Sequence, residues 1–307
     1  MSEFNQMVRR ILILAVGGLT ALLLTTSISG QAAPSANQFV ENSSTETSEL
    51  KSAAHDSKAS LKPRSASRKV AVIIDDLGNG MEGTEEILNL PIKLTVAVMP
   101  FLETTQEDAR RAHERGHDVI IHMPMEPKQG KPEWLGPGAI LTSMSDEEIR
   151  QRVEAAIDQV PYAVGMNNHM GSKVTEDERV MSVVLQVCRE RGLFFIDSRT
   201  NYRSVVPRLS EAMGLPRLEN NIFLDDVGSE AHVTKQLRQV LNMLKKGERN
   251  SCVTIGHVGI QGKKTAAALK KNIPILQSEG VEFIGTSELV WEQFSPSLQL
   301  GPGVTLP

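Results

Sequence analysis

The sequence predicts an α/β fold, a distorted parallel (β/α) barrel of seven or eight units that follows a signal peptide and a linker. Three observations point to it. Short apolar runs alternate with amphipathic helices from residue 69 onward, the runs are continuously apolar, and Asp or His lies within three residues after six of the eight. Continuous apolar runs are typical of strands that are covered on both faces, as they are in parallel sheets.

Composition and charge exclude one class of function. The chain of 307 residues carries 33 Lys and Arg against 37 Asp and Glu, a formal net charge of −4. That balance leaves no strongly basic surface of the kind that binds nucleic acid. The only cysteines, Cys188 and Cys252, are too few for a zinc-finger framework. We expect two separate core thiols, with a disulfide as the alternative outside the cytoplasm.

Residues 1–32 predict a signal peptide or a membrane anchor. Arg9 and Arg10 precede the apolar run Ile11–Leu24, and small residues that suit a cleavage site follow at Gly30–Ala32. The run is short for a membrane span, yet the uncharged residues after it could extend it across a bilayer. Export to the periplasm is the favoured expectation, and anchoring in the inner membrane with the chain facing the periplasm is the alternative.

The rest of the chain divides into three parts. Residues 33–68 are rich in Ser, Ala, Thr and Lys and poor in large apolar side chains, which predicts a disordered linker. Residues 69–292 carry the strand and helix signals and form the predicted barrel domain. Residues 293–307, with several Pro, Gly and Ser, predict a flexible C-terminal tail.

Helix start signals lie between the predicted strands. Ser145 and Glu148 form a capping box ahead of an apolar repeat at helical spacing that ends at Pro161. Capping residues also predict helix starts at Thr175 and Ser229. The predicted strands are Val70–Ile74, Leu94–Val98, Val119–Ile121, Ala163–Met166, Leu193–Ile196, Ile222–Leu224, Val253–Ile255 and Val281–Ile284.

Polar residues follow six of these strands. In a parallel barrel all the strand ends meet at one face, where enzymes of this fold keep their active sites, whereas an open doubly wound sheet would spread them along an edge. This convergence of polar groups favours the barrel. The residues, in chain order, are Asp75 and Asp76, His122, His169 after Asn167 and Asn168, Asp197, Asp225 and Asp226, and His257.

Asp76, His122 and His169 form the predicted metal site. One Asp and two His are a familiar ligand set for zinc or a similar first-row metal that keeps positions open for water. The adjacent acids Asp75 and Asp76 follow a buried strand, where an unpaired carboxylate is unfavourable. A divalent cation would neutralise one acid and keep both ionised.

The other residues at the strand ends have alternative roles. The reference pKa of about 6.5 suits His257 to protonating a leaving amine, and a packed core histidine is the alternative. The neighbouring amides Asn167 and Asn168 suit hydrogen bonding to a sugar or orientation of an imidazole. Substrate binding, orientation of a base and a structural ion pair all stay open for Asp197, Arg199, Asp225 and Asp226.

Five segments together resemble the divergent polysaccharide deacetylase family. The resemblance extends from about Lys69 to Trp291, and the motifs occur in the family's order. It implies a distorted barrel of the polysaccharide deacetylase type and a metal-dependent deacetylase of N-acetyl glycans. The implied partner is a cell-envelope glycan such as peptidoglycan. The segments are Ile73–Gly78, His122–Pro127, Asn168–Ser172, Phe195–Thr200 and Gly256–His257.

The resemblance also implies residue roles. Better-known polysaccharide deacetylases carry an Asp-Asp pair whose first member is the base and whose second binds the metal, which implies Asp75 as base and Asp76 as ligand. His257 resembles the general acid near the family's last strands. The residues expected to contact the substrate or to support the ligands are Glu126, Asn167, Asn168, Asp197, Arg199 and Asp225.

One position departs from the related enzymes. They have a Gly-His-Glu-x-x-x-His-x-x-x-His stretch whose last two histidines bind metal. Here Gly116–Glu126 is similar, with His122 at the first ligand position and Glu126 where the second histidine would stand. Either Glu126 is a ligand or His169 replaces the missing histidine, and we expect His169. The departure keeps a second function open, a catalytically weak or inactive barrel that binds glycan or a cell-wall protein.

Overall fold

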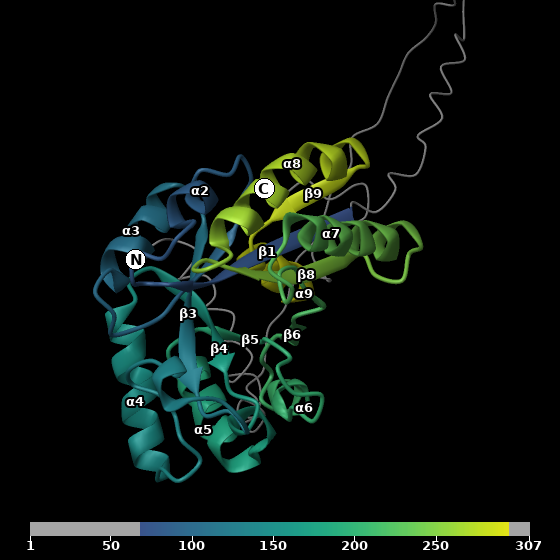
Figure 1. The fold of residues 1–307 in the computed structure, drawn as a ribbon. Helices are drawn as coiled ribbons and strands as arrows, with labels where there is room; N and C mark the ends of the chain where they lie inside the picture. Colours follow the sequence, from purple (N-terminus) through teal and green to yellow (C-terminus); the bar gives the residue numbers. More distant parts are fainter. Residues whose placement is uncertain (1–67, 295–307) are drawn as a thin grey trace, which may run out of the picture.

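Residues 68–294, the part of the chain that the computed structural model describes, form one parallel sheet curled into an incomplete barrel (Figure 1). Hydrogen bonds join the strands in the order β6-β5-β4-β3-β2-β1-β8-β7, and β9 pairs with β1. Within the described residues β6 and β7 do not pair, so the barrel stays open there. The strands are β1 (Arg68–Leu77), β2 (Thr95–Val98), β3 (Asp118–Met125), β4 (Ala163–Met170), β5 (Phe194–Asp197), β6 (Leu218–Glu219), β7 (Ile222–Phe223), β8 (Ser251–His257) and β9 (Val281–Ile284).

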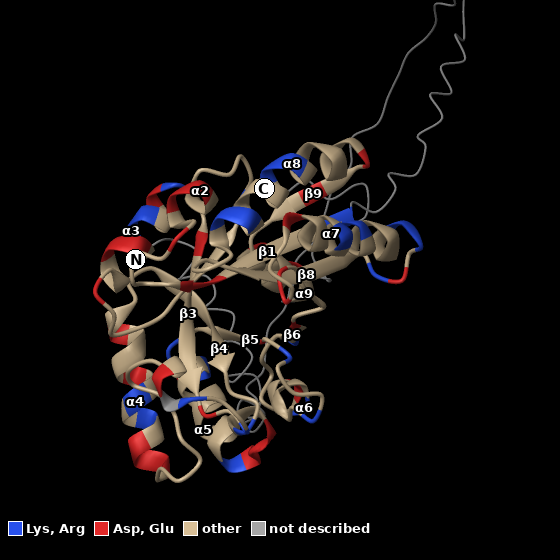
Figure 2. Cartoon of the chain, in the orientation of Figure 1, with Lys and Arg blue, Asp and Glu red and all other residues tan. Residues whose placement is uncertain are grey.

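Helices connect the strands and, apart from the last helix, cover the outer face of the sheet. Charges of both signs are interspersed along α4 and α5 (Figure 2), as expected for helices whose other face packs on a core. The helices are α2 (Thr84–Leu88), α3 (Thr105–Glu114), α4 (Asp146–Gln159), α5 (Glu178–Glu190), α6 (Val206–Ala212), α7 (Glu230–Lys245), α8 (Gly262–Ser278) and α9 (Thr286–Phe294), with short 3₁₀ turns η1 (Pro132–Trp134) and η2 (Val174–Glu176).

Three predictions concern the ends of the chain, most of which the structure does not describe. The predicted signal peptide or anchor, nearly all of the linker and most of the tail lie outside the described residues. Between residues 68 and 294, no helix has both the length and the apolar character that crossing a bilayer requires.

The predicted helix caps are confirmed at two positions and wrong at one. Ser145 and Glu148 form the capping box of α4, and Ser229 accepts a hydrogen bond from the backbone N–H of His232 at the start of α7. At α5 the cap is Asp177, which accepts from Val180 N. Thr175 lies instead in η2, where its hydroxyl donates to the carbonyl of Gly171, so it is not available to cap α5.

Strand alternation divides the apolar core into an outer and an inner layer. Val72 and Ile74 belong to the cluster that packs against the helices, whereas Ile73 and Ile120 belong to the cluster inside the barrel. Because both faces are buried, the strands are continuously apolar. The α9 side chain Leu289 joins the inner cluster at the amino end of the sheet, so the opposite, carboxyl end is left for polar groups.

Cys188 and Cys252 are both buried and free, which confirms the expectation of separate core thiols.

A β-bulge at the end of β1 lets two successive acids face the barrel interior. Simple alternation would send Asp76 outward and Leu77 inward, but Leu77 packs in the outer cluster together with Ile74. The register of β1 on β2 shifts between Ile74 and Leu77, and Asp76 has φ 72°, a conformation that side-chain-bearing residues rarely adopt. The bulge adds one residue and places Asp76 beside Asp75.

Gly165 makes room for an aromatic ring inside the barrel. A Cβ at this position would lie 2.3 Å from Cε2 of Phe194, far inside van der Waals contact. We predict that Gly165→Ala lowers the free energy of unfolding by about 1–3 kcal/mol, because the ring must shift. Urea unfolding measures the loss. In a Phe194→Leu background the same substitution should be much milder, and an equal loss in both backgrounds would contradict this explanation.

Candidate metal centre

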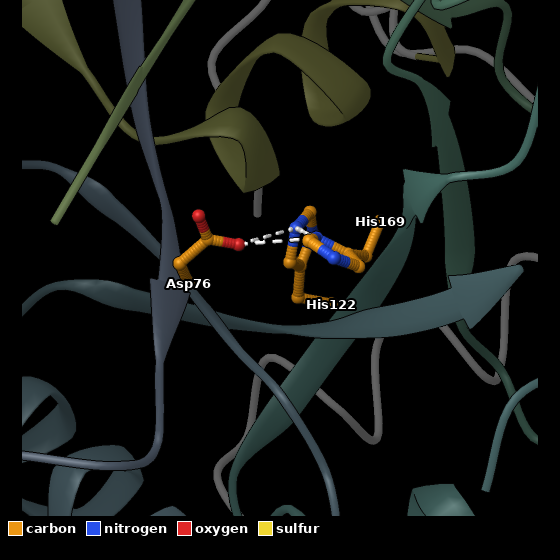
Figure 3. Close-up of side chains that lie close together, drawn as sticks. All are labelled: Asp76, His122 and His169. Carbon is orange, nitrogen blue, oxygen red and sulfur yellow. Dashed lines mark hydrogen bonds and ion pairs between the residues drawn. The ribbon is translucent and has the colours of Figure 1, made fainter. Parts of the chain in front are cut away.

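Asp76, His122 and His169 bring three ligand atoms together at the carboxyl end of the sheet (Figure 3). His122 Nε2 lies 3.3 Å from Asp76 Oδ1, and His169 Nδ1 lies 3.1 Å from the same oxygen. The two ring nitrogens are 3.0 Å apart. The side chains come from β1, β3 and β4, so the predicted convergence of strand ends assembles the predicted ligand set.

Asn167 determines which nitrogen of His122 carries the proton. Its Nδ2 donates to Asp75 Oδ1 at 2.8 Å, and its Oδ1 lies 2.7 Å from His122 Nδ1. An ionised carboxylate only accepts hydrogen bonds, so the amide nitrogen must face Asp75 and the amide oxygen must face the imidazole. His122 therefore donates through Nδ1–H, and its Nε2 presents a lone pair toward Asp76 and His169.

A backbone carbonyl sets the tautomer of His169 in the same way. His169 Nε2 lies 3.0 Å from the carbonyl oxygen of Trp134, which can only accept. The proton is therefore on Nε2, and Nδ1 presents its lone pair to the cluster. This role of the Trp134 carbonyl was missed by the sequence analysis, since a backbone oxygen leaves no signal in the residue type.

Three acceptor atoms thus face one another with no hydrogen between them. Asp76 Oδ1 is buried and has no hydrogen-bond donor among the described residues. Such an arrangement is repulsive unless a cation lies among the lone pairs. One carboxylate and two oriented imidazoles fit a divalent metal ion, and the hydrogen bonds to the far nitrogens are the supports that metal-bound histidines usually have.

The local electrostatics also favour a positive charge at this position. Burial by itself would lower the pKa of His122, but the carboxylates of Asp75 and Asp76 outweigh burial and raise it. Asp75 is only 1% exposed, and burial raises the pKa of its carboxyl above the ordinary range. A raised pKa makes the Asp75 carboxylate a stronger proton acceptor when it is ionised.

His257 lies across β1 from this cluster and is held by Asp225. The Cα register pairs Asp75 with His257, and His257 Nδ1 donates to Asp225 Oδ1 at 2.8 Å. Asp225 Oδ2 also accepts from His257 N and from Thr265 Oγ1, at 2.8 and 2.7 Å. Burial opposes a charged imidazole, but the hydrogen bond with Asp225 and the nearby Asp75 outweigh it and raise the pKa of His257 to about 9. Asp225 is therefore a positioning residue for His257.

Glu126 does not join the three ligands. Its Oε2 accepts from both the N–H and the hydroxyl of Thr142 at 2.7 Å, and its Oε1 pairs with Lys173 at 2.7 Å. Both oxygens are therefore committed to holding the loop after β3. Glu126 and His169 were the two candidates for the role of the missing histidine, and it is His169 that lies beside Asp76 and His122.

The remaining candidates join the ends of β4 and β5. Asn168 Oδ1 accepts from Ser198 N at 3.0 Å, and its Nδ2 donates to Met170 O at 2.8 Å. Asp197 Oδ1 accepts from Arg199 N at 2.8 Å, while the Arg199 guanidinium pairs with Glu219 at 3.5 Å. These contacts shape the rim of the site. Asp226 pairs with His232 of α7 instead of joining the cluster.

We predict that the purified protein binds about one zinc ion per chain and that His169→Ala weakens this binding at least about 100-fold, because one of three ligands is lost. Glu126→Gln, the matched control, should change zinc affinity less than about threefold. Competition with a chromogenic chelator measures both. Strong loss in Glu126→Gln with retained binding in His169→Ala would reverse the ligand assignment.

Comparison with known proteins places this geometry in a family. The family model described as "Divergent polysaccharide deacetylase" matches residues 72–290. The uncharacterized protein YibQ of Escherichia coli strain K12 is 35% identical over 189 residues, which cover 62% of this chain and 58% of that protein. An uncharacterized protein of Haemophilus influenzae is 32% identical over 224 residues, 73% of this chain and 77% of the relative.

A solved structure shares the fold. The uncharacterized protein ATU2773 from Agrobacterium tumefaciens C58 superposes with a TM-score of 0.67 at 21% identity, over 73% of this chain and 89% of that one. The match of the family model extends through all three ligand-bearing strand ends and His257. The chain therefore belongs to the divergent polysaccharide deacetylase family, as its motifs predicted.

Proposed function

We propose that this protein is a zinc-dependent hydrolase that removes acetyl groups from an N-acetylated glycan of the cell envelope. The observation that carries the proposal is the convergence of three lone pairs, from Asp76, His122 and His169, beside the buried acid Asp75 and the imidazole of His257 that Asp225 holds. The family description supports a polysaccharide as the substrate class. Two imidazoles with a single carboxylate favour zinc over magnesium or calcium.

The proposed location is outside the cytoplasm, where such a glycan lies. The Arg9-Arg10 pair and the apolar run Ile11–Leu24 support export or anchoring in the inner membrane. Digestion of the full chain by protease added to intact spheroplasts tests this location, and complete protection would contradict it.

The residues around the ligands have complementary parts in the proposed reaction. A divalent cation at the site would supply Lewis-acid polarisation of the acetyl carbonyl and would lower the pKa of water. Asp75 takes the proton of the attacking water while Asn167 holds its Oδ1 in place. As the C–N bond breaks, His257 gives its Nε2 proton to the departing sugar nitrogen. The products are acetate and a free amine on the sugar.

Release of acetate from an N-acetylated glycan tests the proposal directly. The zinc-loaded protein should produce one free amine for each acetate, and zinc removal by a chelator should stop the reaction. Binding of glycan with no acetate release would instead favour the alternative of a non-catalytic glycan-binding barrel.

Asp75→Asn should lower kcat for acetate release by at least about 100-fold, because an amide cannot accept the proton from water. Its amide oxygen can still accept the Asn167 hydrogen bond, so zinc content should stay the same. Asp226→Asn is the matched control, since this exposed acid follows the neighbouring β7 and pairs with His232. It should change kcat less than about twofold. Unchanged turnover in Asp75→Asn would refute the proposed base.

The pH dependence of kcat should fall off above about pH 9 as His257 loses the proton that it donates. The raised pKa means that the imidazole stays charged at all lower pH values. In Asp225→Asn the hydrogen-bonded carboxylate is gone, so the pKa of His257 falls and the alkaline limb should move to lower pH. Steady-state rates from pH 6 to 10 measure the limb. An alkaline limb at the same pH in both proteins would show that another group titrates.

A further inference from the structure

The helix pair α7 and α8 carries an excess of positive charge. Residues 230–279 contain nine Lys or Arg and three Glu, although the whole chain has a net charge of −4. Figure 2 shows Lys and Arg along both helices with acids near their ends, whereas α4 and α5 carry both signs throughout. This pair is therefore basic on a protein that is acidic overall. The cations are Lys235, Arg238, Lys245, Lys246, Arg249, Lys263, Lys264, Lys270 and Lys271.

Four of these cations lie on the exposed side of the helix pair. Asn272 Nδ2 of α8 donates to Thr234 Oγ1 of α7 at 3.0 Å, which places the two helices side by side. The next residues along the chain from this contact, Lys235 and Lys271, are both exposed. Helical spacings of three and seven residues place one further exposed cation of each helix on the same side. We call these four residues the basic face: Lys235, Arg238, Lys264 and Lys271.

The acids near the basic face do not neutralise it. Within residues 68–294 no member of the basic face forms an ion pair, because the nearest acids have other partners. These pairs are Glu279 with Lys245, Glu248 with Lys246, Glu82 with Lys263, and Asp226 with His232.

Three more acids border the helix pair and have no ion pair in the described part of the chain. They are Glu86 of α2, Glu230 at the start of α7 and Glu282 of β9. The unpaired cations are twice as many, because Arg249 and Lys270 add to the basic face. Positive charge therefore remains in excess after all of these acids are counted, and the face attracts an anionic surface.

The chain enters the barrel at the end of the same helix pair. Arg68, the first described residue, donates through Nη1 to the carbonyl of Glu279 at the end of α8, at 2.8 Å. Residues 25–67 separate this point from the apolar run Ile11–Leu24, which predicts a signal peptide or a membrane anchor. An anchor joined to the barrel here would raise the effective concentration of bilayer at the basic face, so that weak contacts suffice.

An exposed apolar side chain adjoins the basic face. Ile275 is 51% exposed and lies one turn after Lys271 on α8. Basic side chains around an apolar one are typical of a helix face that rests on the headgroups of an anionic bilayer. The stems of Lys and Arg then lie along apolar surface while their charges reach the phosphates.

We infer that the basic face of α7 and α8 docks on the surface of a bilayer that contains anionic phospholipid. Attraction between its four cations and the lipid phosphates provides the affinity, about fivefold for each cation near the surface. Both helices run alongside the strands (Figure 1), so docking leaves the carboxyl end of the sheet, with the metal centre, open. An acidic protein would meet the same charges, but the entry of the chain beside this face favours a bilayer.

Energy transfer to lipid headgroups tests the docking in the full chain. Because Cys188 and Cys252 are buried, Asn242→Cys on the exposed side of α7 takes a donor dye selectively. The chain is inserted into phosphatidylcholine vesicles with or without phosphatidylglycerol, and both carry an acceptor on the headgroups. Transfer should be at least about threefold greater with phosphatidylglycerol. Raising NaCl from about 0.05 to about 0.5 M should remove the difference, because salt screens the attraction.

A fourfold variant tests whether the basic face makes the contact. Replacing its four residues together, as Lys235→Gln, Arg238→Gln, Lys264→Gln and Lys271→Gln, should abolish the difference between the two kinds of vesicle. The matched control removes the same amount of charge from exposed positions on four other helices. This control is Arg110→Gln, Arg152→Gln, Arg179→Gln and Arg208→Gln, and it should retain most of the difference.

Several outcomes would overturn the inference. They are equal transfer in the two kinds of vesicle, an equal loss in the control variant, equal lipid dependence from a donor at Gln151→Cys on α4, or displacement by polyglutamate at the same charge concentration. The last result would indicate an acidic protein as the partner. The proposed function is tested separately, since acetate release is measured on soluble glycan. Loss of docking with acetate release intact would refute only this inference.

Discussion

The repulsion among three converging lone pairs is the constraint on which the rest of the site depends. Asp76 Oδ1, His122 Nε2 and His169 Nδ1 approach within 3.0 to 3.3 Å of one another. Two hydrogen bonds maintain this arrangement, one from His122 to Asn167 and one from His169 to the Trp134 carbonyl. With either histidine turned to its other tautomer, a proton would lie between the acceptors and would compete with a metal ion for the same position.

The barrel supplies the rigidity that such an arrangement requires. Below the polar layer the inner positions of the strands are apolar and tightly packed, as Gly165 against Phe194 illustrates. The strained backbone of Asp76, with φ 72°, is maintained because Ile74 and Leu77 on either side are buried in the outer core. The packing of apolar residues thereby stabilises the unusual bulge, whereas the charge of the buried Asp75 is favoured by His122, His257 and the hydrogen bond from Asn167.

Much of the site could be predicted because parallel strands end at a common face. Asp76, His122 and His169 were placed together from their positions after apolar runs, and the capping box at Ser145 was readable from local sequence. Thr175 looked equally good as a cap, but it lies in η2, its hydroxyl donates to the carbonyl of Gly171, and Asp177 caps α5. Short polar side chains can bond to several nearby backbone groups, and the residue pattern does not decide which of these bonds forms.

The sequence by itself determined eight of the nine strands in the described part of the chain and the identities of the residues at their ends, because these follow from apolar runs and chain connectivity, and it missed only the two-residue strand β6. Only the tertiary structure decided between Glu126 and His169 as partner of the other ligands, since Thr142 and Lys173 occupy the Glu126 carboxylate. The tertiary structure also decided which nitrogen of each histidine carries the proton and that the Asp76 side chain faces the barrel interior. The physical reason is that these depend on hydrogen-bond partners and on a register shift between strands, which residue spacing does not encode.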